Sequence, residues 1–154
     1  MTQRIDIMEK GQEAVKTLYG LAKYFSKSSI ERSLLDLIHF RISQINGCAF
    51  CLDMHSKDLR AEGETEQRLY VLNAWREAPF YSERERAALG WAEAVNKHDV
   101  PDEIYNEARK KFSEEELIEL TMAVAAINCW NQLNIAFHPV VGTYQPGAYA
   151  ALDR

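Results

Sequence analysis

Apolar residues recur every three or four positions through most of the chain, and no segment alternates apolar and polar residues as a half-buried strand does. This pattern predicts helices throughout. The first amphipathic stretch ends in the serine-rich residues 26–29, where Ser28 and Glu31 have the spacing of a capping box for the next helix. The apolar stripe of the first stretch consists of Val15, Leu18, Leu21, Ala22 and Phe25.

A second helix is predicted from this capping box to the Asn-Gly pair at 46–47, which is suited to ending a helix. Cys48 then begins a third helix that runs toward Gly63. Thr65 begins a fourth, which should finish before Pro79 because a proline disfavours helical geometry in the residue before it. The apolar side of the second helix consists of Leu34, Leu35, Ile38, Ile42 and Ile45.

Three further helices are predicted from their start signals. Ser82 and Ser113 are each followed three positions later by a glutamate, which is again the capping-box spacing. Pro101 is followed by two acidic residues that suit the first turn of a helix. The last helix should run from about Ser113 to Phe137, since His138 precedes a proline.

Length and composition favour one globular domain. The chain has 154 residues, of which 47% are hydrophobic and 27% charged, and it contains neither an internal repeat nor a low-complexity linker. We therefore expect residues 1–154 to form a single all-α domain, a bundle of six or seven helices.

The stretch from Leu120 to Phe137 carries no charge and is long enough to approach the thickness of a membrane. Its amides argue against lipid, so we expect a helix buried by protein on several sides, in part by another subunit. Cys129 is predicted to be a buried free thiol there, because no second cysteine is near it in the sequence. The amides are Asn128, Asn131, Gln132 and Asn134.

The residues after the last helix, 139–154, are too apolar for a free tail. We expect them to dock on this chain or on a neighbouring subunit. The apolar residues are Val140, Val141, Tyr144 and Tyr149.

Charge and the amino-terminal sequence limit the partners. The 18 Lys and Arg against 23 Asp and Glu give a net charge of -5, and no basic run marks a phosphate-binding face, so nucleic acid is not expected as a partner. The segment MTQRIDIMEKGQEAV lacks the continuous apolar stretch of a secretory signal. A cytoplasmic protein is expected.

The candidate chemistry lies in Cys48-Ala-Phe-Cys51-Leu-Asp-Met-His55. On a helix, residues three and four apart share a face, so Cys48, Cys51 and His55 project from one side. The free N–H groups at the start of the helix favour thiolate, and His55 can exchange a proton one turn away. A second thiol within reach then permits a disulfide. The spacing therefore favours redox chemistry.

Two other interpretations use the same residues. In the first, both cysteines are small core residues, and His55 is an ordinary surface or core histidine. In the other, these three residues bind zinc, but a structural zinc site normally has four ligands, and this sequence offers no second Cys-X-X-Cys motif or histidine pair. Asp36 or His39 would complete such a site only if the fold happened to bring one of them there. We expect no bound metal or organic cofactor.

The chain resembles the AhpD-like alkylhydroperoxidases of the carboxymuconolactone decarboxylase superfamily, in a short branch with a single Cys-X-X-Cys motif. An acidic residue, Asp36, lies twelve positions before Cys48, and His55 follows Cys51 by four. The similarity extends from about residue 30 onward, through SKDLRAEGETEQRLY, PFYSERERAALGWAEAV and INCWNQLNIAFHPVVGTYQPG. It implies an all-helical subunit that assembles into homo-oligomers, often hexamers, and reduces hydroperoxides at the expense of a thiol protein or a small dithiol.

The resemblance also implies a role for each residue. Cys51 would attack the peroxide oxygen, Cys48 would resolve the resulting sulfenic acid, His55 would relay the proton, and Asp36 would act as acid and base through it. Two positions depart from the family pattern. Asp36 is shorter than the usual glutamate, and Phe50 stands where the best-known peroxidases of the family have a histidine, which makes the surroundings of the thiols more apolar.

Asp36 and His39, which precede the motif, can also be interpreted as structural residues. Asp36 has an alternative interpretation as a helix charge that pairs with His39 or Arg32. His39 itself is expected to be structural.

The favoured function is a thiol-dependent hydroperoxide reductase acting in antioxidant defence. Two alternatives remain open at this point. One is a non-redox enzyme of the carboxymuconolactone decarboxylase kind, which needs no cysteine pair. The other is a non-catalytic, redox-responsive oligomer whose disulfide alters partner binding or stability.

Overall fold

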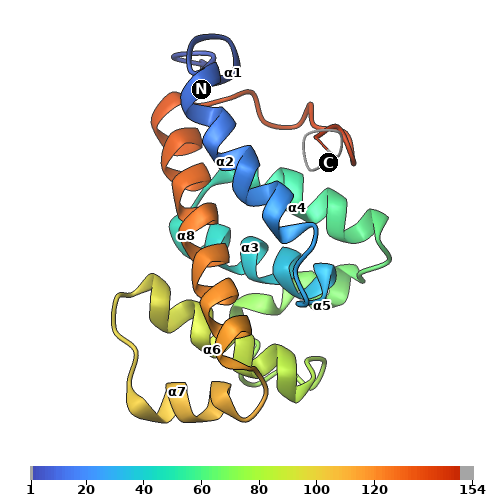
Figure 1. The fold of residues 1–154 in the computed structure, drawn as a ribbon. Helices are drawn as coiled ribbons and strands as arrows, with labels where there is room; N and C mark the ends of the chain where they lie inside the picture. The colour runs from blue at the N-terminus through green and yellow to red at the C-terminus, as the bar shows by residue number, and fades with distance from the viewer. Residues whose placement is uncertain (1, 150–154) are drawn as a thin grey trace.

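The structure is a computed structural model that describes residues 2–149, and the regular elements of that part are all helical. The elements run in the order α1 (Ile7–Lys10), α2 (Gln12–Phe25), α3 (Arg32–Asn46), α4 (Ala49–Ala61), α5 (Glu66–Tyr70), a 3-10 turn (Leu72–Ala74), α6 (Glu83–Asn96), α7 (Asp102–Arg109) and α8 (Glu114–Phe137) (Figure 1). The predicted all-α class is confirmed. Helices α2 to α8 are the seven that the sequence predicts, and α1 is an additional single turn. Within residues 2–149, no helix combines the length and apolarity that crossing a membrane requires.

Most helix ends follow from the predicted capping residues. The hydroxyls of Ser82 and Ser113 each accept the backbone N–H of the glutamate three positions on, and the carboxylate of that glutamate accepts the backbone N–H of the serine. Gly47 ends α3 in the left-handed region, at φ 71°, which a glycine adopts without strain. The capping box predicted at Ser28 is wrong. Its hydroxyl donates to Glu119 on α8 instead, and α3 begins without a side-chain cap.

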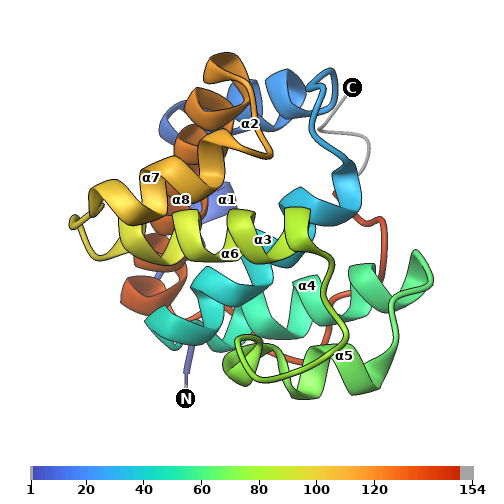
Figure 2. The ribbon, with the colours of Figure 1, turned by 90° about the horizontal axis from the view of Figure 1, so that it is seen from below.

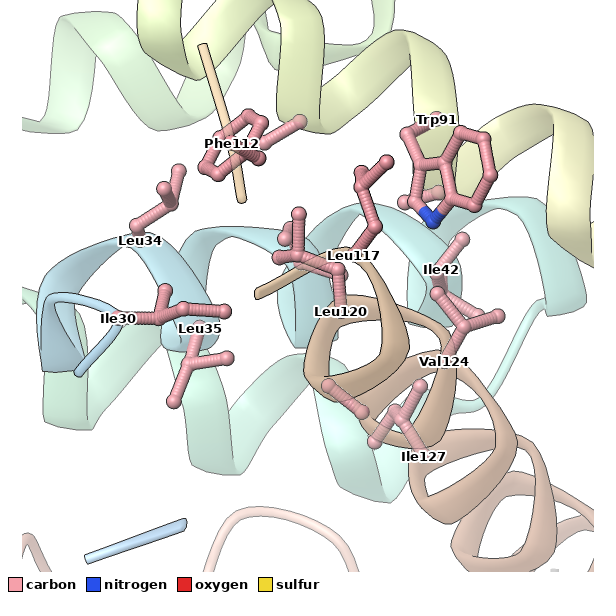
Figure 3. Close-up of a cluster of buried hydrophobic side chains, with 14 of the residues drawn as sticks. Ile30, Leu34, Leu35, Ile42, Trp91, Phe112, Leu117, Leu120, Val124 and Ile127 are labelled. Carbon is pink, nitrogen blue, oxygen red and sulfur yellow. The ribbon is translucent and has the colours of Figure 1, made fainter. Parts of the chain in front are cut away.

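Helix α3 lies at the centre of the bundle because both of its sides are apolar. One side packs against α6 and α8 in a cluster that includes Leu34, Leu35, Ile42, Trp91, Leu120 and Val124 (Figure 3). The other side, through Leu37 and Phe40, packs against Leu59 of α4 and against residues of the α5 region. Seen from below, α3 accordingly lies between α6 and α4 (Figure 2).

Helix α8 is the long helix that the uncharged stretch predicts. It contacts α2, α3, α4, α6 and α7, which explains why apolar residues occur on most of its sides. Its burial is incomplete within this chain, since Met122 and Ile135 are exposed. Cys129 is exposed as well, so the prediction of a buried thiol is wrong.

The carboxyl-terminal segment docks on α4, as expected for a tail of this composition. Tyr144 is 7% exposed, and its hydroxyl donates to Asp58 at 2.8 and 2.9 Å. Lys57 donates to the carbonyls of Gly142 and Tyr144, and the Gly142 N–H donates to Asp53. Docking is therefore confirmed for residues 139–149, and the rest of the predicted docking segment, 150–154, lies outside the described residues.

Candidate active site

The two cysteines of the motif form a disulfide at the start of α4. Cys48 is the residue that caps the helix, and its sulfur accepts the backbone N–H of Cys51 at 3.4 Å. The Cα atoms are 5.4 Å apart, and each cysteine is 1% exposed. This is the geometry that a Cys-X-X-Cys pair takes when the first cysteine precedes the helix and the second lies in its first turn. The pair is thus positioned for reversible disulfide chemistry.

The two sulfurs differ in their surroundings. Cys51 lines a cavity of about 740 Å³, whereas Cys48 is not among the lining residues. The Cys51 sulfur also accepts a hydrogen bond at 3.3 Å from the side-chain amide of Asn134 on α8. A donor aimed at sulfur favours the thiolate once the disulfide is reduced. Both sulfurs accept a hydrogen bond, so access to the cavity is what singles out Cys51 as the sulfur that a ligand there meets.

The cavity lies between α2, α3, α4 and α8 and is closed further by both ends of the described chain. Residues from the amino-terminal segment, such as Ile5, line it together with residues of the docked tail, such as Tyr144. Much of the remaining lining is apolar or aromatic, including Phe50, Met54, Trp130 and Phe137.

Three ionisable side chains of the lining converge beside the disulfide helix. Asp36, His39 and His55 each contribute a ligand-type atom, and these atoms lie within 4.8 Å of one another. The two imidazole rings are 5.4 Å apart, and His39 Nδ1 is 4.0 Å from Asp36 Oδ1. The structure thus brings together the three predicted residues Asp36, Cys51 and His55 around one cavity, with Cys48 behind Cys51.

The alternative interpretation of Asp36 is confirmed in part: Asp36 does pair with Arg32, but it is only 4% exposed and so is not a charge in contact with solvent. Arg32 donates to it from Nε at 2.8 Å. Among the described residues, no hydrogen bond joins Asp36 to His55. A gap therefore separates the Asp36 carboxylate from the His55 ring, although both line the same cavity.

Burial sets the protonation of all three groups. It raises the pKa of Asp36 to about 6, even though Arg32 pulls that pKa downward. Burial lowers the pKa of His39 to about 4, with a further contribution from Arg32. The pKa of His55 is well below the ordinary value, first because of burial and then because of His39 and Arg32. At neutral pH both imidazoles are neutral, and Asp36 is the group that titrates nearest to neutrality.

Two members of this site were not predicted. His39 was expected to be structural, yet it belongs to the buried cluster with Asp36 and His55. Its position three residues after Asp36 on one helix face was the available signal. Asn134 had no such signal beyond its place in an uncharged helix, since its contact with Cys51 joins residues 83 positions apart.

The sequence of this site corresponds to a known family. The model of the carboxymuconolactone decarboxylase family matches residues 10–94, which include Asp36, Cys48, Cys51 and His55. The chain belongs to the carboxymuconolactone decarboxylase family. Its resemblance to the AhpD-like members is also confirmed, because it is 40% identical to a protein of known structure that has been suggested to be AhpD.

Individual relatives extend the comparison. The uncharacterized protein YdfG of Bacillus subtilis (strain 168) is 45% identical over 88% of this chain and 95% of its own length. A crystal structure of an Agrobacterium tumefaciens protein of unknown function, for which a role as the antioxidant defence protein AhpD has been suggested, is 40% identical. It superposes with a TM-score of 0.88 over 93% of this chain and 100% of its own. The debrominase Bmp8 is 24% identical with a TM-score of 0.77, over 95% of this chain and 78% of its own, which is a likeness of fold.

Proposed function

We propose that this AhpD-like chain is a thiol-dependent hydroperoxide reductase that serves antioxidant defence. The observation that carries the proposal is the position of Cys51. It is the member of a disulfide-forming pair that lines the cavity, and the same cavity is lined by Asp36 and His55. A nucleophilic sulfur, a resolving sulfur and proton-transferring groups are the components that reduction of a peroxide by thiols requires.

The reaction balances with one hydroperoxide and one reduced cysteine pair. The Cys51 thiolate attacks the terminal oxygen of the O–O bond, which breaks and releases the alcohol once its oxygen gains a proton. Cys51 is then a sulfenic acid. The Cys48 thiolate attacks the Cys51 sulfur, the S–O bond breaks, and water leaves with a second proton. An external dithiol reduces the disulfide and completes the cycle.

His55 and Asp36 divide the proton work according to their surroundings. A neutral imidazole can accept the proton of the Cys51 thiol and later deliver one to the departing oxygen. Asp36, whose pKa is about 6, is the better resting acceptor, because burial keeps the pKa of His55 well below that value. The thiol proton therefore passes through His55 to Asp36, across the gap described above.

The apolar lining favours organic hydroperoxides over hydrogen peroxide as substrates. Phe50, Met54 and Trp130 offer little to a small polar oxidant but can bury a hydrocarbon group. We expect the ratio of kcat to KM to rise from hydrogen peroxide to tert-butyl hydroperoxide and cumene hydroperoxide.

The test is peroxide consumption with a dithiol reductant, dithiothreitol or dihydrolipoamide. Cys51→Ser should abolish turnover. Cys129→Ser is the matched control, because Cys129 is a free, exposed thiol away from the pair, and this variant should keep the native rate. Mild oxidation of the reduced native chain should remove two thiols and leave one. Turnover that survives in Cys51→Ser would refute the proposal.

The two alternative functions predict different results. A non-redox enzyme of the carboxymuconolactone decarboxylase kind would show no cysteine-dependent peroxide consumption with any peroxide. A redox-responsive oligomer would also lack turnover, but its assembly or stability would change when the Cys48–Cys51 disulfide is reduced. Light scattering on both redox forms separates the two.

We propose further that the chain assembles as a homo-oligomer, with a hexamer favoured by the AhpD-like resemblance. Support comes from large apolar side chains exposed on the outer side of α8 and on the tail, since a monomer rarely exposes many of them together. Light scattering at micromolar concentration should give a mass several times the 17.7 kDa of one chain, and a monomer mass would contradict this. The exposed residues are Ile118, Met122, Ile135, Val140 and Val141.

A further inference from the structure

The buried cluster of Asp36, His39 and His55 has more coordinating capacity than a proton relay uses. Asp36 and His39 lie three positions apart on one face of α3, and His55 approaches them from α4, which packs against α3. One carboxylate and two imidazoles thus face one another from two rigid helices. A relay needs only one imidazole and the carboxylate, so His39 has no task in it.

Both imidazoles carry a nitrogen without a partner. Nε2 of His39 and Nε2 of His55 are buried, and within residues 2–149 neither has a hydrogen-bond partner. Buried polar atoms are nearly always paired in folded proteins, and an unpaired one destabilises the fold unless something else satisfies it. Two such nitrogens in rings 5.4 Å apart, beside a carboxylate that is 4% exposed, point to a common ligand.

We propose that Asp36, His39 and His55 form a binding site for one divalent transition-metal ion of the zinc class. The three groups are the donor set of sites in which a metal has three protein ligands and keeps a further position for water or a substrate. That further position opens into the cavity, because all three ligands and Cys51 line it. The ligands of this site are not the cysteine set considered from the sequence, and the disulfide does not interfere with them.

The distances fit after a small closure. Zinc binds histidine nitrogen and carboxylate oxygen at about 2.0 to 2.2 Å, so two ligand atoms of a tetrahedral site lie roughly 3.3 Å apart. The ligand-type atoms here, one from each residue, lie within 4.8 Å of one another, and of the two His39 nitrogens it is Nδ1 that is 4.0 Å from Asp36 Oδ1. A side-chain rotation that moves each ligand atom by less than about 1 Å would bring the three atoms to tetrahedral spacing. Arg32 binds the other carboxylate oxygen, Oδ2, so Oδ1 is the oxygen that is left for an ion.

Metal occupancy and the proton relay exclude each other, a consequence that rests on the proposed function. A nitrogen of His55 that binds metal cannot carry a proton, and neither can the Asp36 oxygen beside it. Bound zinc should therefore inhibit peroxide reduction reversibly. The binding site itself does not depend on that function.

Binding is tested on tag-free protein in the disulfide form, so that no thiolate of the pair can act as a ligand. Titration with Zn²⁺ by calorimetry, and with Co²⁺ by visible absorption, should give one ion per chain. A rise in Tm on addition of Zn²⁺ should accompany binding, because an ion that binds only the folded state stabilises it. Native protein that binds less than one equivalent, or that binds without a change in Tm, would overturn the proposal.

His39→Asn and His98→Asn form a matched pair of histidine substitutions. His98 is exposed in the turn after α6, with a φ of 59° that asparagine tolerates, and is not part of the cluster. His39→Asn should weaken Zn²⁺ binding by more than about 100-fold, since loss of a residue that only supports a ligand already costs about 10- to 100-fold. His98→Asn should bind as the native chain does. Equal binding by the two variants would refute the assignment.

A second variant and a crystal structure test the metal site independently of His39→Asn. Should His39→Asn fail to fold by circular dichroism, Asp36→Asn takes its place and should lose binding to the same extent. A crystal structure grown with Zn²⁺ should show anomalous density between the three side chains, and a water molecule bridging the two rings instead would contradict the proposal. Turnover that is absent from every protein would count against the proposed function and leave the binding result standing.

Discussion

Asp36 and Glu93 are equally buried carboxylates, each 4% exposed, but they are held in opposite ways. Burial raises the pKa of both, yet the final pKa of Glu93 is lowered while that of Asp36 rises to about 6. One reason is that Asp36 is more densely surrounded by protein atoms, and the other is the number of donors. Glu93 receives hydrogen bonds from Trp75, Arg41 and Arg76, at 2.9, 2.8 and 2.7 Å, whereas Asp36 receives one from Arg32 at 2.8 Å among the described contacts.

This difference in the number of donors distinguishes a carboxylate that supports the helix bundle, Glu93, from one that belongs to the candidate site, Asp36. A carboxylate with three donors is fixed as an anion and joins α3, α6 and the turn that carries Trp75. A carboxylate with few donors keeps a pKa within reach of neutral pH and faces a cavity with two imidazoles. Buried polar groups that lack hydrogen-bond partners destabilise a fold. Several of them gathered at one place therefore indicate a functional site.

The largest expected effect is on the site side of this comparison. His55→Ala should slow peroxide reduction by about 10²- to 10⁴-fold, the usual contribution of general acid-base catalysis, while helicity and oligomer size stay as in the native chain. Stopped-flow oxidation of the reduced protein measures the rate, and circular dichroism with light scattering measures the rest. A native rate would show that the relay does not pass through His55.

On the framework side, Glu93→Gln should lower the free energy of unfolding by about 3 kcal/mol, because it leaves the largely buried guanidinium of Arg41 without its counter-charge. Urea unfolding measures the loss. Glu77→Gln, at an exposed position four residues before Tyr81, is the control and should change the free energy of unfolding by less than about 0.5 kcal/mol. Similar values for the two variants would remove the distinction between Glu93 and a surface acid.

Asp36→Asn should change how the free energy of unfolding depends on pH, which tests the raised pKa of Asp36. The folded pKa of about 6 lies above the reference of 3.8, so the native chain binds the extra proton between these values. The associated stability is present in full below about pH 3.8 and is lost as pH rises through 6, by up to about 3 kcal/mol. Asparagine does not titrate, so the variant should gain stability relative to the native chain between pH 4 and 7. A constant difference across that range would contradict a raised pKa.

The same substitution should affect the rate less than His55→Ala does. Asp36 acts on the thiol only through the imidazole, so its loss leaves the first proton acceptor in place. Rates of the two variants, measured side by side at pH 7, decide this order. A slower Asp36→Asn than His55→Ala would mean that the carboxylate acts on the substrate directly.

The smallest expected effect concerns a third carboxylate, Asp58, which is paired by the docked tail. Tyr144→Phe removes the hydroxyl that donates to both of its oxygens, and should destabilise docking by about 1.5 kcal/mol. Hydrogen exchange should become about tenfold faster in residues 139–149 and stay unchanged in α6. Unchanged exchange in the tail would show that the backbone contacts with Lys57 and Asp53 hold it alone.

The helix framework was predictable because its signals are local. Ser82, Ser113 and Gly47 determine helix ends through neighbours within a few residues. Ser28 has the same local signal as Ser82, but Glu119, 91 positions away, binds its hydroxyl. The spacing of neighbouring residues does not reveal a distant side chain that binds the capping hydroxyl instead.

The cysteine pair and His55 were predictable for the same reason, since one helix carries them. His39 and Asn134 enter the site only through the packing of α3 and α8 on α4, which the sequence pattern does not specify. Cys129 was misplaced because α8 is apolar on most sides, so periodicity does not reveal which side faces outward. The cytoplasmic location and the class of reductant, a thiol protein or a small dithiol, stay predictions.

The hydrogen bond from the Cys51 N–H to the Cys48 sulfur gives the protein its own spectroscopic reporter. In the disulfide the acceptor is a neutral sulfur, whereas after reduction the same atom can carry a full negative charge beside the amide proton. The amide resonance of Cys51 should therefore move to a different frequency when the pair is reduced, and the amide of Leu52, which is bonded to the Cys48 carbonyl, should move less. An NMR titration of isotope-labelled protein with dithiol can thus follow the redox state of the pair in the intact protein, without substrate and without an attached reporter group.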